Sequence, residues 1–209
     1  MQFCEIMVSF YERYERRDRM LYFSEPGEHN TDAVLDLVFE TAVKEGIRHV
    51  VLPSTRGKVA TKALEMVPED IDLVIVTHSV GFRKSGVDEF DPEVRKLYEN
   101  TRHKILTTTH LFRGLEGYFY KKFGGVYPPQ FFAAALRLFG EGTKVAVEIA
   151  LMAADAGLIP IDQWVISAGG TGKGLDTAYI LKACNTRDLS EFRFGRLLAI
   201  PSEFYSRRS

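Results

Sequence analysis

The sequence is poor in cysteine, almost balanced in charge and without a long apolar run. Its two cysteines, Cys4 and Cys184, form neither a CxxC pair nor a cluster with histidines. Neither a disulfide framework nor a zinc motif is therefore predicted, and a reducing cytoplasm is the simplest compartment. The formal net charge of -1 gives no overall positive field, so nucleic acid is not an expected partner.

Segments for export or for crossing a membrane are missing too. The first residues show no basic start, apolar core or small-residue cleavage site, which argues against a signal peptide. The longest apolar stretch, residues 145–156, is interrupted by Glu148 and Asp155 and is shorter than the roughly 20 residues that span a bilayer. We expect a buried helix here and no membrane partner. Glu148 is either a buried carboxylate paired with a strand-end donor or a rim residue, and the structural role is favoured.

Motifs of metal sites and of serine hydrolases are also absent from the sequence. His29, His49, His103 and His110 show no HxxxH or HxH spacing. No GxSxG nucleophile elbow occurs. We therefore expect no metal centre, and a hydrolase function loses support.

What is present is an alternation of apolar patterns in a chain of 209 residues, 45% of them hydrophobic, which suffices for a full core. Short β-branched runs predict strands over residues 20–23, 47–52, 73–77, 104–109, 163–167, 179–183 and 196–200. Helical spacing predicts helices between them, over residues 31–45, 59–66, 128–139 and 143–156 and after Asp91. This order predicts one α/β domain with a mostly parallel, doubly wound sheet over residues 20–209. Residues 1–19 are expected to be a helical or flexible extension.

The strongest functional signal is the loop that follows the predicted strand 47–52. Its residues Ser54, Thr55, Arg56, Gly57 and Lys58 combine two hydroxyls, two cationic side chains and a glycine directly before a helix. Helix N-termini bind anions through free N–H groups and the helix dipole. The sequence therefore predicts a phosphate site here. The alternative is an ordinary helix cap with a solvated arginine and lysine.

Three further loops follow predicted strands and are expected at the same edge of the sheet. One contains Thr77, His78 and Gly81, where His78 could donate to a ligand or relay a proton, although a lone histidine is more often structural. The next contains Thr108 and Thr109.

The last of these loops begins with Gly169, Gly170 and Thr171. It departs from GxxxxGK[ST], since Ser167 stands in place of the first glycine and Gly174 in place of the Ser or Thr. A nucleoside triphosphatase is therefore not supported. So many glycines still suggest that the backbone approaches a flat or anionic group closely. A flexible turn between two strands is an equally good interpretation.

Several strings together resemble small archaeal and bacterial proteins with the fold of the pyruvate kinase C-terminal domain. They are YFSEPG at residues 22–27, THSVGF at 77–82, FGG at 123–125, VEIALMAADAGLIP at 147–160, and GGT with DTA at 169–171 and 176–178. The resemblance covers about residues 20–201 and implies a three-layer α/β/α domain. The extension at residues 1–19 has no counterpart in it.

The resemblance implies a ligand but no kinase activity, because the catalytic barrel of about 250 residues does not fit in this chain. In pyruvate kinase the similar loop holds the phosphate of a sugar bisphosphate effector. For the stand-alone relatives the expected ligand is flavin mononucleotide (FMN), with its phosphate on residues 54–58 and its ring against Thr77, His78, Gly81, Thr108, Thr109 and residues 169–171. The chain would then be a flavoprotein, with oxidoreductase as the suggested activity.

Two alternatives to a flavoprotein stay open at this point. One is a non-catalytic sensor of a phosphorylated metabolite. The other is a transferase or isomerase that acts on a phosphorylated substrate with His78 as acid or base, for which the sequence names no carboxylate partner. The sequence is compatible with a homo-oligomer and does not define its size.

Overall fold

The computed structural model describes residues 20–202, so the predicted extension at residues 1–19 lies outside the described part of the chain. Two short 3-10 helices, Glu28–Asn30 and Thr186–Glu191, accompany the main elements. The strands and helices follow one another as β1 (Leu21–Phe23), α2 (Thr31–Glu45), β2 (His49–Pro53), α3 (Lys58–Met66), β3 (Asp72–Val76), α4 (Pro92–Glu99), β4 (Lys104–Leu106), α5 (Leu115–Phe123), α6 (Pro128–Arg137), α7 (Glu141–Asp155), β5 (Val165–Gly169), β6 (Thr177–Lys182) and β7 (Arg193–Pro201).

The strands form one seven-stranded sheet in the order β1-β7-β6-β5-β2-β3-β4. All neighbouring strands are parallel except for β6, which is antiparallel to both β5 and β7. The expected mostly parallel α/β sheet is therefore confirmed. Because six strands point the same way, their ends gather at one edge, which we call the carboxyl edge. The loops after β2, β3, β4 and β5 all open there.

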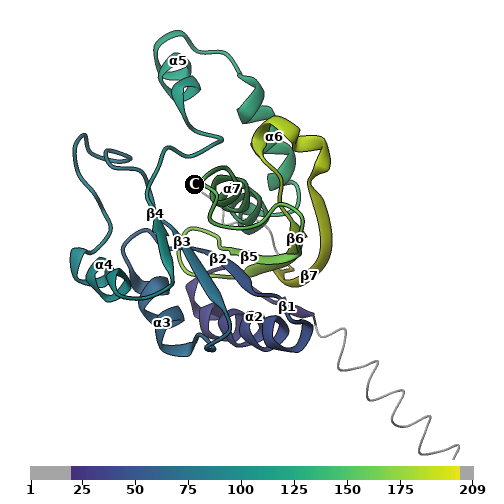
Figure 1. The fold of residues 1–209 in the computed structure, drawn as a ribbon. Coiled ribbons are helices and arrows are strands. Elements are labelled where there is room, and N and C mark those ends of the chain that lie inside the picture. Colours follow the sequence, from purple (N-terminus) through teal and green to yellow (C-terminus); the bar gives the residue numbers. More distant parts are fainter. Residues whose placement is uncertain (1–19, 203–209) are drawn as a thin grey trace, which may run out of the picture.

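Helices cover both faces of the sheet (Figure 1). On one face, α2, α3 and Tyr98 of α4 pack against residues such as Leu52, Leu73 and Ile166. On the other face lies α7, whose residues 146–154 are all buried between the sheet and α6. The predicted buried helix is thus confirmed, and Glu148 is buried inside it. None of the described helices is both long and apolar enough to cross a membrane.

Local sequence rules explain where several helices begin and end. The side chain of Asp91 accepts a hydrogen bond from the backbone N–H of Glu93, 2.8 Å away, and Pro92 occupies the first turn of α4. Helix α2 ends at Gly46, which has φ 66° and so adopts the left-handed conformation that favours glycine. These signals lie within a few residues of each helix end, which is why the sequence predicts them.

Apart from shifts of a few residues at element ends, the structure differs from the sequence expectation most clearly in two places. Strand β4 ends at Leu106, not near residue 109, because its neighbour β3 ends at Val76, directly opposite. Residues 107–109 therefore continue as a loop. The glycine- and aromatic-rich stretch around residue 120, for which no element was predicted, forms helix α5, and Figure 1 shows it standing away from the sheet.

Candidate functional site

The predicted phosphate loop lies between β2 and α3, at the carboxyl edge. Gly57 is the N-cap of α3 and has φ 102°, a conformation that side chains other than glycine rarely adopt. A Cβ atom at this position would also lie 2.9 Å from Cγ2 of Val94 on α4. Glycine is therefore required both by the backbone and by the neighbouring helix.

The backbone at the start of α3 offers donors to an anion. The hydroxyl of Ser54 is buried and accepts a hydrogen bond from the N–H of Ala60 at 3.2 Å, so it supports the first turn of the helix. Within the described residues, the N–H groups of Lys58 and Val59 have no acceptor. Such free N–H groups are the usual basis of anion binding at a helix N-terminus.

The two cationic side chains of the loop are placed differently. The ammonium group of Lys58 forms an ion pair and hydrogen bond with Glu28. That hydrogen bond, together with the charge of Lys58, lowers the pKa of Glu28. Arg56 is exposed and has no ion-pair partner among residues 20–202. Arg56 is therefore the cation of the loop that can approach a ligand without breaking an existing pair.

His78 lies directly beside this loop and is held by a carboxylate. Its Nε2 atom is 3.4 Å from the hydroxyl of Thr55, and its Nδ1 atom is 2.8 Å from a carboxylate oxygen of Glu89. The ring also stacks on Phe82, with 3.9 Å between centroids. Burial lowers the pKa of His78, although the hydrogen bond to Glu89 acts in the opposite direction. A hydroxyl, an imidazole and a carboxylate thus form a line, as in sites of acid–base catalysis.

A second histidine–carboxylate pair lies deeper, between the sheet and α7. His110 donates from Nε2 to the carbonyl oxygen of Thr77 at 3.1 Å, and its Nδ1 atom lies 3.5 Å from Glu148. Glu148 also accepts from the backbone N–H of Phe112 at 2.8 Å and pairs with Lys144. Burial alone would raise the pKa of Glu148, but the hydrogen bond from His110 and the charge of Lys144 hold it at about 2. Glu148 is thus the buried, paired carboxylate that was one of two expectations.

The glycine loop between β5 and β6 is held by contacts within the protein. A Cβ atom on Gly169 would collide with the carbonyl of Gly142 in α7, and one on Gly170 would collide with the carbonyl of Gly174. Asp176 is fully buried and accepts hydrogen bonds from the N–H groups of Gly27 and Thr171 at 3.0 and 2.9 Å. Close packing of the chain on itself is therefore sufficient to explain these glycines.

The arrangement of these loops can be compared with known protein families. A family model described as pyruvate kinase, alpha/beta domain, matches residues 32–181, more than two thirds of the chain. The chain belongs to the pyruvate kinase alpha/beta domain family. The matched range begins in α2 and ends in β6, so it includes the loops after β2, β3, β4 and β5. The resemblance inferred from the sequence is confirmed for family and fold.

In this pyruvate kinase alpha/beta domain the predicted ligand residues fall into two groups. The first group surrounds His78 and the start of α3. Thr77 belongs to it but is buried, with its hydroxyl 2.7 Å from that of Thr107, and Gly81 has φ 82° in the turn of the same loop. Thr108 and Thr109 are exposed in the neighbouring loop.

The second group is residues 169–171, which are tied to the loop after β1. Glu28 connects this glycine loop to the first group. This residue packs against Gly174 and also pairs with Lys58. The structure therefore brings Thr55 and His78 together, whereas the side chain of Lys58 pairs with Glu28 on the side of the glycine loop.

Sequence reasoning missed the partners of His78. Glu89 is eleven residues further along an irregular loop, and no spacing rule connects the two positions. Phe82 belongs to the string THSVGF, but no periodicity predicts that it stacks on the histidine. Arg113 was also missed and lies over the ring of Phe82 at 5.1 Å. The one sequence signal for these partners was that the loops expected at the carboxyl edge are rich in polar and aromatic residues.

The rest of the described surface adds two observations. A hollow of about 530 Å³ lies at the opposite edge of the sheet, where it is lined by Arg48, Trp164 and Arg196 among others. It is remote from the residues predicted to bind a ligand. Residues 20–202 contain no group of three or more histidine, cysteine, aspartate or glutamate side chains placed to hold a metal ion.

Proposed function

We propose that this chain is an FMN-binding protein in which the loop of residues 54–58 binds the phosphate. The observation that carries the proposal is the start of α3, where the N–H groups of Lys58 and Val59, the hydroxyl of Thr55 and the exposed Arg56 lie within five consecutive residues. Backbone donors and a guanidinium group suit the oxygens of a phosphate monoester. Bound flavin supplies the electron-transfer chemistry, so oxidoreductase is the proposed activity class.

The residues next to this loop fit the remainder of such a ligand. His78 and Phe82 offer aromatic faces, and the hydroxyls of Thr108 and Thr109 are exposed on the adjoining loop. Glu89 fixes the orientation of His78, so that Nε2 faces the phosphate loop. A proton can therefore be held at Nε2 beside the ligand, while the stacked ring of Phe82 limits access of water to one side.

The test is a titration of the purified full-length chain with FMN, followed by flavin fluorescence and thermal unfolding. Saturating FMN, at about one hundred times its Kd, should raise Tm by roughly 5–10 °C. Arg56→Gln should weaken binding about tenfold, as expected when one charge-assisted hydrogen bond is lost. Lys104→Gln serves as the control. It removes the same charge from the first residue of β4, at the end of the strand away from the carboxyl edge.

The proposal fails if FMN changes neither the fluorescence nor Tm. It also fails if Arg56→Gln and Lys104→Gln weaken binding equally, because the phosphate would then bind elsewhere.

A second candidate is a sensor that binds a phosphorylated metabolite without a flat ring. It is favoured by the packing of His78, Phe82 and His110 on one another, with centroids 3.9 to 5.5 Å apart, since these rings already have aromatic partners. A sugar bisphosphate, and not FMN, should then raise Tm. The same Arg56→Gln variant should abolish that shift.

The line from Thr55 through His78 to Glu89 favours a third candidate, an acid–base enzyme acting on a phosphorylated substrate. Glu89 supplies the carboxylate partner that the sequence could not name. Its test is an activity that disappears in His78→Ala while binding of the phosphorylated ligand persists. An activity that survives His78→Ala would remove this candidate.

A further inference from the structure

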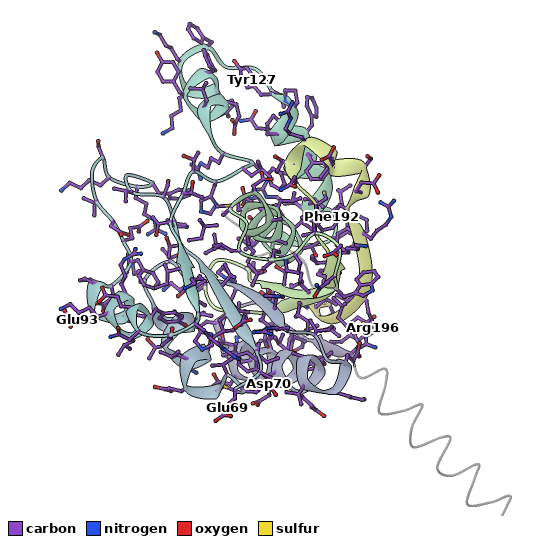
Figure 2. All side chains as sticks on the ribbon, in the orientation of Figure 1. Glu69, Asp70, Glu93, Tyr127, Phe192 and Arg196 are labelled. Atoms are coloured by element: carbon purple, nitrogen blue, oxygen red, sulfur yellow. The ribbon has the colours of Figure 1, made fainter. Side chains whose placement is uncertain are left out.

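Helix α5 is unusual because it buries none of its residues in the described chain. Leu115, Phe119 and Phe123 are spaced four residues apart and form one stripe along it. Their exposed fractions are 73%, 38% and 67%, and Tyr118 beside them is 54% exposed. Apolar stripes of this kind normally pack against a partner. Figure 2 shows the segment of α5 and Tyr127 standing away from the body of the domain.

Helix α6 repeats the feature on its outer face. Its inner face packs on α7 through Ala133 and Leu136. Its outer face carries Phe131, which is 64% exposed, and just beyond its end Leu138 is 77% exposed. A helix that is apolar on both faces is expected to be covered on both. The second cover is missing in a single copy of the chain.

The two helices and the loop between them form one apolar segment, residues 115–139, which we call the aromatic arm. Its nine exposed large apolar residues are Leu115, Tyr118, Phe119, Tyr120, Phe123, Val126, Phe131, Leu138 and Phe139. Together they expose on the order of 900 Å² of side chain. The largest apolar patch on a monomeric protein is about 300–600 Å², whereas each partner of a standard interface contributes about 800 Å². The arm therefore has the area of an interface.

We propose that the aromatic arm is the interface through which two copies of this chain form a two-fold dimer. The summed area is comparable to one side of a stable dimer. Residues 115–139 include only four charged residues, as expected for the apolar interface of a permanent homodimer. A two-fold axis places the same surface on both sides. Antiparallel α5 helices would put Phe119 near the axis and Leu115 opposite Phe123 of the second copy.

The proposed dimer interface also lies next to the candidate site in sequence. Arg113, immediately before α5, lies over the ring of Phe82, which stacks on His78. A second copy bound to the arm would therefore lie near the loops after β3 and β4. This inference does not depend on the identity of the ligand and can be tested without one.

The experiment is sedimentation velocity on the full chain at concentrations up to about 100 µM, well above the µM dissociation constants of standard interfaces. The wild type should sediment at twice the chain mass of 23.7 kDa. The double variant Phe119→Glu/Phe123→Glu should sediment at the mass of one chain. Its Tm in dilute solution should change little, since no residue of α5 is fully buried within one copy and Phe119 makes its ring contacts with other rings of the arm. Val43→Glu, at a residue 59% exposed on α2, is the matched control and should leave the dimer intact.

Three results would overturn the proposal. The first is a wild type that remains a single chain over the whole concentration range. This result includes a monomer whose arm binds phospholipid vesicles in a flotation assay. The second is a dimer that survives Phe119→Glu/Phe123→Glu. The third is a dimer lost in Phe10→Glu of the full chain but not in the arm variant, which would assign the interface to residues 1–19.

Discussion

Two histidine–carboxylate pairs lie near the ends of neighbouring strands. They share their residue types but differ in the burial of the carboxylate and in the groups that the histidine faces. Glu148 is fully buried between the sheet and α7, where Lys144 and a backbone N–H complete the contacts of the carboxylate, and its partner His110 is 14% exposed. His78 and Glu89 lie at the rim, with the free side of the histidine facing Thr55. The inner pair has all its hydrogen-bonding groups directed into the protein. The outer pair directs one nitrogen to the place where a ligand is expected.

This difference separates stability from function. A buried ion pair is strongly coupled to folding, because removal of one partner leaves an uncompensated charge in the core. The outer pair is partly exposed, with 20% of the His78 side chain and 10% of the Glu89 side chain accessible, so its loss should cost less than the loss of a fully buried charge. The inner pair should therefore control unfolding, and the outer pair should control what happens to a ligand.

The largest expected effect comes from breaking the inner pair. Glu148→Gln should lower the free energy of unfolding by about 3–5 kcal/mol, because the ammonium group of Lys144 would remain buried without its counter-charge. Chemical denaturation followed by circular dichroism measures this. Glu141→Gln in the same helix is the control, since its pair with Arg137 is far more exposed, and it should cost about 0.5 kcal/mol or less. Equal costs for the two variants would contradict the structural role of Glu148.

Acid should destabilise the protein in two separate pH windows, and each pair contributes to one of them. The pKa of Glu148 is about 2 in the folded chain against 4.5 in the unfolded one. Its contribution of roughly 3 kcal/mol is therefore present above about pH 4.5 and lost as the pH falls toward 2. The pKa of His78 is lowered below 6.5 by burial, so the unfolded chain takes up this proton first. Stability should also decline as the pH falls below 6.5.

These windows can be assigned by substitution. The decline between pH 4.5 and 2 should be weaker in Glu148→Gln. The decline just below pH 6.5 should become shallower in His78→Gln but not vanish, because burial also lowers the pKa of His49 and of His103. The measurement is the free energy of unfolding as a function of pH. If both variants keep the wild-type profile, other groups carry the dependence.

The inner pair and the outer pair were not equally visible in the sequence. An apolar run interrupted by Glu148 and Asp155 predicts a buried helix, which α7 confirms, and Glu148 is the buried carboxylate that was one of two expectations. The strand, glycine and helix around residues 54–58 were predicted because these signals are local, and phosphate binding there stays a prediction. His78 was placed correctly at a strand end, but Glu89 lies in a long irregular loop whose path depends on contacts such as that of Gly81 with Val87.

Other features were hidden for related reasons. The antiparallel direction of β6 depends on the compact loop between Gly169 and Thr177, whereas the pattern of apolar residues within a strand is the same in both directions. Helix α5 contains a glycine and has no fully buried residue in one copy. Its stripe of Leu115, Phe119 and Phe123 has helical spacing, but it covers only three positions and was not recognised in the sequence. Contacts between distant segments leave no such local signal.

The smallest expected effect on stability comes from breaking the outer pair, and it is the sharpest test of the comparison. Glu89→Gln removes the group that raises the pKa of His78, so this pKa should fall further below 6.5, as measured by NMR titration of the ring. The free energy of unfolding should change by about 1–2 kcal/mol, less than for Glu148→Gln, because one partly buried hydrogen bond is weakened and no charge is left buried without a partner. Any activity that uses His78 should fall while binding through Arg56 persists, because Glu89 orients the ring and does not contact the phosphate loop. If Glu89→Gln instead lowers the free energy of unfolding as much as Glu148→Gln does, the outer pair also stabilises the fold. The separation of stability from function is then wrong.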